Sequence, residues 1–143
     1  MILYLDTSAT VKLYASEPGS AETRRAVAAA DQIASNLLAY VETRAALARK
    51  HRMRQLSDAD LDRSKIAFET DWKGFIKMPA DADTVRRASD LAEQYRLRAY
   101  DAIHLASADR LYRETRARIG FLCFDATLNS AGAKLGFTVV AAD

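Results

Sequence analysis

Four acidic residues stand close to points where helices and strands are expected to begin or end: Asp6, Glu42, Asp101 and Asp125. Asp6 and Asp125 each follow a short apolar run, whereas Asp101 precedes the nearly apolar segment 102–108. Carboxylates gathered in one place are the ligands that Mg²⁺ and Mn²⁺ prefer. Divalent cations held in this way lower the pKa of a water molecule and neutralise a phosphate oxyanion. The chemistry that this set of acids would suit is phosphodiester hydrolysis.

The elements that must position these acids follow from the hydrophobic pattern. Short apolar runs suit buried strands at 2–5, 32–35, 75–78, 121–124 and 138–140. Cap residues and helical spacing predict helices at 9–15, 21–30, 36–50, 57–72, 81–95, 101–113 and 129–135. Strands that alternate with helices predict an α/β fold, in which a mainly parallel sheet of four or five strands lies between two helical layers.

This topology would bring the acids together. The carboxyl ends of parallel strands share one edge of a sheet, and ligands bind in the crevice there. The helix that begins at Asp101 leads into the strand that ends before Asp125, so it must begin at that edge. Glu42 lies about six residues into its helix, roughly 9 Å from the same edge at 1.5 Å per residue. It borders an expected apolar stripe formed by Leu38, Val41, Ala45 and Ala48.

Each acid also has an ordinary structural interpretation. Asp6, Asp101 and Asp125 all stand where a helix N-cap is expected, and aspartate is a favoured cap. Taken alone, Glu42 is typical of a solvated helix position. The four acids together need a different interpretation from each acid alone. Four carboxylates in one crevice repel one another unless a cation or a shared proton neutralises them.

Composition limits the class of protein. The chain has 143 residues, of which 50% are hydrophobic and 28% charged, as expected for one globular domain over 1–143. One cysteine and two histidines cannot make an internal disulfide or a structural zinc site. No apolar stretch approaches the roughly 20 residues of a membrane span, and the N-terminus lacks the features of a signal peptide. We therefore expect a cytoplasmic protein.

The motifs that carry the four acids resemble those of the PIN domains. The segment 4–14, YLDTSATVKLY, is similar to the first motif of that family, and 35–46 is similar to the second. The segment 101–108, DAIHLASA, is close to the third motif, and 124–131 resembles the fourth. The match covers nearly the whole chain. This small, single-domain form resembles the VapC toxins of type II toxin–antitoxin pairs.

The resemblance implies a PIN fold and a Mg²⁺-dependent endoribonuclease, with Mn²⁺ as a possible substitute for Mg²⁺. It also implies homodimers and inhibition by a VapB-type antitoxin. By position, Asp6 and Asp101 match the principal metal ligands of the family, and Glu42 and Asp125 match its other acids. Some members carry a further acid after the fourth motif, where this chain has Asn129.

Other residues could serve the same site. Thr7 and Ser8 could orient the substrate, or they could act as turn hydroxyls. His104 shares a helix face with Asp101, and a hydrogen-bonded core histidine is the favoured interpretation over a supporting role in the site. In the basic run 49–54, Arg49 and Arg52 could contact RNA phosphates, although cations also suit the end of a helix.

Rival functions make demands that this sequence does not meet. A haloacid-dehalogenase phosphatase needs a second aspartate two residues after the first, where this chain has Ser8. A response-regulator receiver needs an acid pair beside the first strand, and a Rossmann site needs a glycine-rich turn there. Two alternatives stay open: a PIN nuclease for RNA processing without an antitoxin, and an inactive PIN-like binding module. We further expect apolar side chains such as Ile66, Phe68 and Trp72 to form part of a dimer or antitoxin surface.

Overall fold

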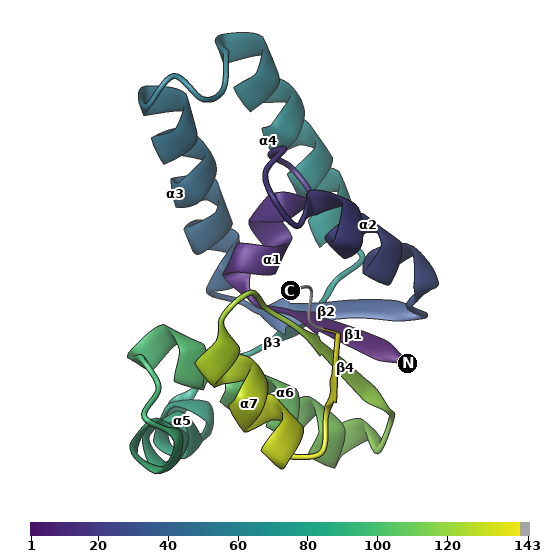
Figure 1. The fold of residues 1–143 in the computed structure, drawn as a ribbon, viewed down its shortest axis with the longest axis vertical. Coiled ribbons are helices and arrows are strands. Elements are labelled where there is room, and N and C mark those ends of the chain that lie inside the picture. The colour runs from purple at the N-terminus through teal and green to yellow at the C-terminus, as the bar shows by residue number, and fades with distance from the viewer. Residues whose placement is uncertain (141–143) are drawn as a thin grey trace.

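The computed structural model describes residues 1–140 as alternating strands and helices (Figure 1). The strands are β1 (Ile2–Leu5), β2 (Gln32–Asn36), β3 (Ile76–Met78), β4 (Ile119–Leu122) and β5 (Thr138–Val139). The helices are α1 (Thr7–Lys12), α2 (Ser20–Ala29), α3 (Ala39–Arg52), α4 (Asp58–Trp72), α5 (Ala82–Tyr95), α6 (Ala99–Thr115) and α7 (Ala126–Lys134). None of the helices in this part of the chain is both long and apolar enough to cross a bilayer.

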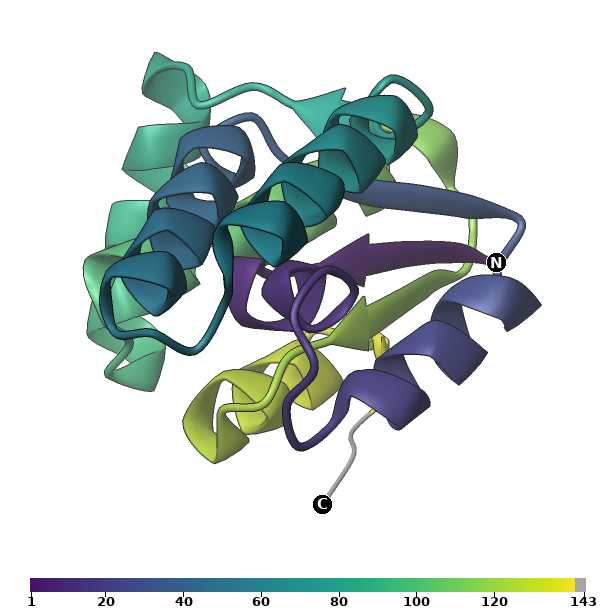
Figure 2. The ribbon, with the colours of Figure 1, turned by 90° about the horizontal axis from the view of Figure 1, so that it is seen from above.

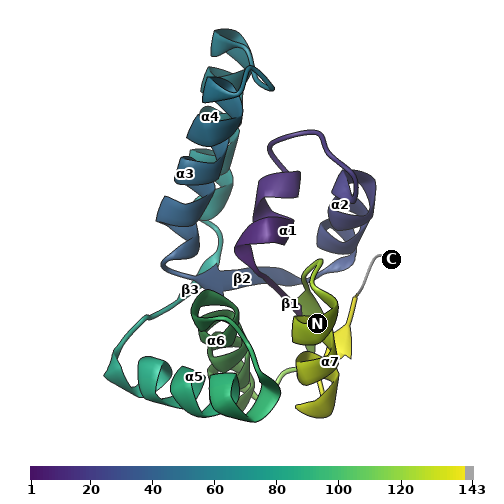
Figure 3. The same ribbon diagram turned by 60° about the vertical axis from the view of Figure 1, so that its left-hand side comes forward.

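The five strands form one parallel sheet in the order β3-β2-β1-β4-β5. Helices α1 to α4 cover one face, and α5 to α7 cover the other (Figures 1 and 3). The predicted α/β/α sandwich with a parallel sheet is therefore confirmed. Because all strands run the same way, their carboxyl ends lie along a single edge, with β1 at the centre of the sheet.

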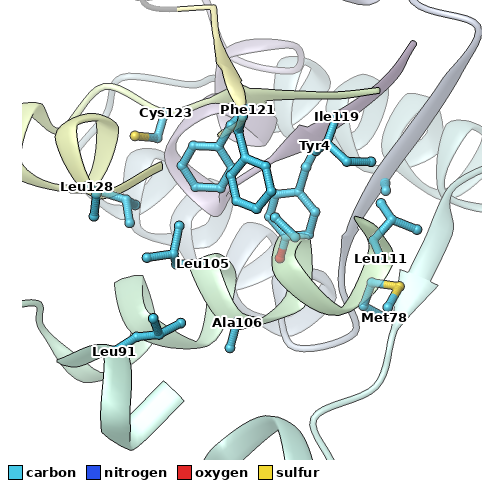
Figure 4. Close-up of a cluster of buried hydrophobic side chains, with 14 of the residues drawn as sticks. Tyr4, Met78, Leu91, Leu105, Ala106, Leu111, Ile119, Phe121, Cys123 and Leu128 are labelled. Atoms are coloured by element: carbon cyan, nitrogen blue, oxygen red, sulfur yellow. The ribbon is translucent and has the colours of Figure 1, made fainter. Parts of the chain in front are cut away.

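Both faces of the central strand are buried, and successive side chains enter different cores. Tyr4 packs with Leu105 and with Phe121, whose ring stacks on Tyr4 at 5.7 Å between centroids (Figure 4). Leu3 and Leu5 enter the second core, beneath α1, α3 and α4. This alternation follows from the period of two along a strand, and it explains why a strand buried on both faces reads as one apolar run.

Two boundaries near the acids differ from the sequence prediction. Helix α6 begins at Ala99, because the Arg98 carbonyl already accepts the Ala102 N–H at 2.9 Å, so Asp101 lies in the first turn and is not the cap. Strand β4 ends at Leu122, so two residues separate it from Asp125. Asp125 is nevertheless the N-cap of α7 and accepts the Leu128 N–H at 2.8 Å.

The predicted apolar stripe of α3 is wrong. The buried residues of this helix are Ala39, Thr43 and Leu47, whereas the Val41 side chain is 59% exposed. These three residues, spaced four apart, form the buried side of α3 because the helix packs against α1 and α4. The helix also begins later than expected, since Asn36 completes β2 and its side-chain oxygen accepts the Leu38 N–H at 2.8 Å.

Helices α3 and α4 lie side by side and extend away from the sheet (Figures 2 and 3). Phe68 and Trp72 are buried in this part of the molecule, so they are not the exposed apolar surface that the sequence suggested. Ile66 is 68% exposed, as predicted. The error arises because Phe68 and Trp72 of α4 pack at tilted angles against the ring of Tyr40 of α3 and so fill the interface between the two helices.

Candidate active site

The four acids come from four different elements and line one pocket of about 230 Å³. Asp6 joins β1 to α1, Glu42 and Asp101 lie in the first turns of α3 and α6, and Asp125 precedes α7. All four positions lie at the carboxyl edge of the sheet. The other residues that line the pocket are Thr7, Ser8, Arg98, Tyr100, His104 and Phe124.

Asp6 is the buried carboxylate of this pocket, with 5% of its surface exposed. Its Oδ1 atom accepts the Ala9 N–H at 2.9 Å and the Ser8 hydroxyl at 2.7 Å, so it caps α1 as well as facing the pocket. Burial raises the pKa of Asp6 above its ordinary value. The ion pairs of the pocket involve Asp101, Asp125 and Glu42, and none of those found within residues 1–140 includes Asp6.

Glu42 ends a chain of hydrogen bonds that starts in the core. The Tyr4 hydroxyl lies 2.8 Å from His104 Nδ1, and His104 Nε2 lies 3.3 Å from the Thr7 hydroxyl. Thr7 donates to Glu42 Oε1 at 2.7 Å, and His104 Nε2 lies 3.5 Å from that oxygen. Burial alone would raise the pKa of Glu42, but His104 and Thr7 outweigh it and hold the pKa below its ordinary value. This series of hydrogen bonds therefore holds Glu42 as a carboxylate that points into the pocket.

This arrangement predicts that His104→Ala lowers the free energy of unfolding by about 2–4 kcal/mol, because it leaves a cavity and an unpaired Tyr4 hydroxyl. Tyr4→Phe should cost about 1–2 kcal/mol, since it removes only one buried hydrogen bond. His51→Ala is the matched control at the surface, with an expected change within about 0.5 kcal/mol. Urea unfolding measures all three. A loss for His104→Ala no larger than that for His51→Ala would contradict the hydrogen-bond chain.

Asp101 and Asp125 share a cationic neighbour. Arg98 Nε donates to Asp101 Oδ2 at 2.9 Å, and Arg98 Nη2 lies 3.9 Å from Asp125 Oδ2. Sequence reasoning missed Arg98, along with Tyr100 and the lining role of Phe124. The sequence feature that could have indicated Arg98 is its position three residues before Asp101, which places both side chains together at the start of a helix.

The four acids offer carboxylate oxygens, which are the ligand type that a hard divalent cation prefers. One of them, Asp6, is buried and has no basic partner among the residues that the structure describes. Within residues 1–140, no three His, Cys, Asp or Glu side chains are already assembled as a metal cage. The acids instead bind protein groups: Asp6 binds Ser8, Glu42 binds Thr7, and Asp101 binds Arg98. Cation binding would therefore exchange some of these contacts for metal contacts.

Three other residues from the sequence analysis lie outside this pocket. Arg49 and Arg52 stand toward the far end of α3, about 10 and 15 Å along the helix axis from Glu42 at 1.5 Å per residue. Asn129 instead contacts Cys123, which follows β4: it donates to the Cys123 carbonyl at 3.1 Å and accepts from the Cys123 thiol at 3.0 Å. The structure thus gathers the acids, Thr7 and Ser8, and leaves the two arginines apart.

Comparison with known proteins agrees with this architecture. The sequence profile of the PIN domain matches residues 3–134. The chain belongs to the PIN-domain family. Its VapC-type members include Ribonuclease VapC45 of Mycobacterium tuberculosis, with 36% identity over 107 residues that cover 75% of this chain and 74% of the relative. This PIN domain is therefore of the VapC type.

Two solved structures share the fold at lower identity. The M. tuberculosis toxin VapC20, described as cleaving the sarcin–ricin loop, gives a TM-score of 0.67 with 16% identity, over 91% of this chain and 95% of that one. A chain of a toxin–antitoxin complex from Klebsiella pneumoniae gives a TM-score of 0.54 with 22% identity, over 82% and 83% of the two chains. At these identities the likeness concerns the fold.

Proposed function

We propose that this VapC-type PIN domain is a Mg²⁺-dependent endoribonuclease and the toxin of a VapBC-type toxin–antitoxin pair. One observation carries the proposal: four carboxylates from four elements line a single pocket, and the buried one, Asp6, has no basic partner within the described residues. The family membership and the relatives named as ribonucleases support the same activity.

Asp6 and Asp101 would hold the cation as principal ligands, with Glu42 and Asp125 completing the set. When bound, such a cation lowers the pKa of a water molecule and neutralises charge on the scissile phosphate. Mn²⁺ would serve as well as Mg²⁺, since both prefer carboxylate oxygens.

The remaining residues of the pocket position the acids. Ser8 donates to both carboxylate oxygens of Asp6, at 2.7 and 2.9 Å, and Thr7 together with His104 orients Glu42. These hydrogen bonds hold both carboxylates in place at the pocket before any ligand enters, and those to Glu42 also lower its pKa. Arg49 and Arg52, farther along α3, would contact RNA phosphates outside the reacting group.

The proposed partners are a VapB-type antitoxin and a second copy of the chain, in the cytoplasm. Leu37 precedes α3 and Val41 is next to Glu42 in its first turn, and the two residues are 52% and 59% exposed. Apolar side chains exposed beside a charged pocket suit a protein that covers the pocket. The Klebsiella complex shows that a chain of this fold occurs in a toxin–antitoxin assembly.

The proposed toxin–antitoxin pairing predicts a stable complex. The chain should purify with the small protein encoded beside it when the two are produced together. RNA cleavage by this complex should be at least a hundredfold slower than cleavage by the chain alone, because the partner covers the pocket. Light scattering and a cleavage assay measure both properties. If the chain is an active monomer and no small protein purifies with it, the toxin assignment fails while the ribonuclease assignment stands.

A further inference from the structure

Arg98 supplies the guanidinium of the carboxylate pocket. It is the N-cap residue of α6, and its side chain makes no cap hydrogen bond. That side chain is 80% exposed, yet its Nε donates to Asp101 Oδ2 at 2.9 Å. Its Nη2 lies 3.9 Å from Asp125 Oδ2. A long, exposed stem thus carries a charge that faces two of the four acids.

The oxygens that face Arg98 are among those that a divalent cation would take. Asp101 is proposed as a principal ligand, and Asp125 completes the set. The guanidinium and a divalent cation repel each other and compete for the same carboxylate oxygens, so binding of the cation disfavours the contact between Arg98 and Asp101. Exposed ion pairs contribute little to stability, so releasing Arg98 from Asp101 costs the fold little.

We propose that Arg98 is a built-in counter-ion that neutralises Asp101 and Asp125 in the metal-free pocket, releases them when a divalent cation binds, and then binds a phosphate of the RNA. The inference rests on the proposed metal site and adds a role that the four acids do not provide. A released guanidinium stays at the mouth of the pocket, because its backbone is fixed at the start of α6. Guanidinium groups bind phosphate oxygens in a bidentate manner, which suits the substrate.

The first test titrates Mn²⁺ into the protein by calorimetry without RNA. Arg98→Gln should bind Mn²⁺ about tenfold more tightly than the wild type, as expected when a unit charge roughly 6 Å from a divalent cation is removed in a water-screened site. Arg98→Lys keeps the charge, so its affinity should stay within about threefold of the wild type. Arg86→Gln is the matched control, since Arg86 is 79% exposed and pairs with Asp83 three residues away on α5, outside the pocket.

The second test measures RNA cleavage at saturating Mn²⁺. Arg98→Gln should raise KM about tenfold and change kcat by less than about threefold, because the lost contact is to a phosphate that does not react. The KM of Arg98→Lys should lie between those of the wild type and Arg98→Gln, since lysine binds phosphate only as a point charge. If Arg98 had only a structural role, Arg98→Gln would not both tighten Mn²⁺ binding and weaken RNA binding.

The outcomes separate this inference from the proposed function. Equal Mn²⁺ affinity for the wild type and Arg98→Gln overturns the counter-ion, even if both cleave RNA. An unchanged KM overturns the phosphate contact. If Arg98→Gln binds Mn²⁺ more tightly but the wild type cleaves no RNA, the counter-ion role is supported and the ribonuclease assignment is contradicted. If no variant binds Mn²⁺, the metal site and the counter-ion both fail.

Discussion

Asp101→Ala is expected to reduce RNA cleavage at least a thousandfold. The change removes a proposed principal ligand, and a bound divalent cation contributes several kcal/mol to stabilising the transition state, at about 1.4 kcal/mol per factor of ten. Asp109→Ala is the matched control. Asp109 lies on the same helix, pairs with Arg87 and Arg113, and its side chain is 15% exposed, against 17% for Asp101. The control should keep its cleavage rate within about threefold.

His104→Ala provides the second comparison on the same RNA. Because His104 orients Glu42 and does not ligate in this scheme, the folded variant should lose much less activity than Asp101→Ala. Circular dichroism establishes that each variant is folded before its rate is measured. Full cleavage by folded Asp101→Ala, or metal-independent cleavage that is lost only in His104→Ala, would replace the metal mechanism with general acid–base catalysis.

Removing metal should have an effect of the same size. EDTA is expected to lower RNA cleavage at least a thousandfold, and Mg²⁺ or Mn²⁺ should restore it, because the four carboxylates would then hold the cation again. Metal should also raise the melting temperature, since a ligand at 100 times its Kd stabilises the folded state by about 2.7 kcal/mol. Asp6→Asn should lose this rise. Cleavage that persists in EDTA would contradict the account.

Much of the fold could be predicted because local signals agreed with the tertiary structure. Ser57 and Asp81 cap α4 and α5 as expected, and each accepts a backbone N–H from three residues later. Asp6 was located by the apolar strand that precedes it. For the acids, the argument from parallel strands to a shared edge was sufficient, because it depends on topology and not on side-chain detail.

The parts that could not be predicted depend on packing between distant elements. The buried face of α3 is set by its contacts with α1 and α4, and these give Leu47 a core position while Val41 stays exposed. The hydrogen bond between Tyr4 and His104 joins residues 100 positions apart. Arg98 was overlooked because its spacing of three residues from Asp101 does not by itself indicate a site, and its contact with Asp125 depends on the tertiary structure.

Anomalous diffraction from crystals grown with Mn²⁺ tests the central claim most directly. The account predicts an anomalous peak inside the pocket, with carboxylate oxygens of Asp6 and Asp101 about 2.0–2.3 Å from it, close to the distances of Mg²⁺ sites. Arg98 should have left Asp101 in the same crystals. A protein that cleaves RNA with Mn²⁺ while its anomalous peak lies elsewhere, or while the four acids keep their present partners, would contradict the account.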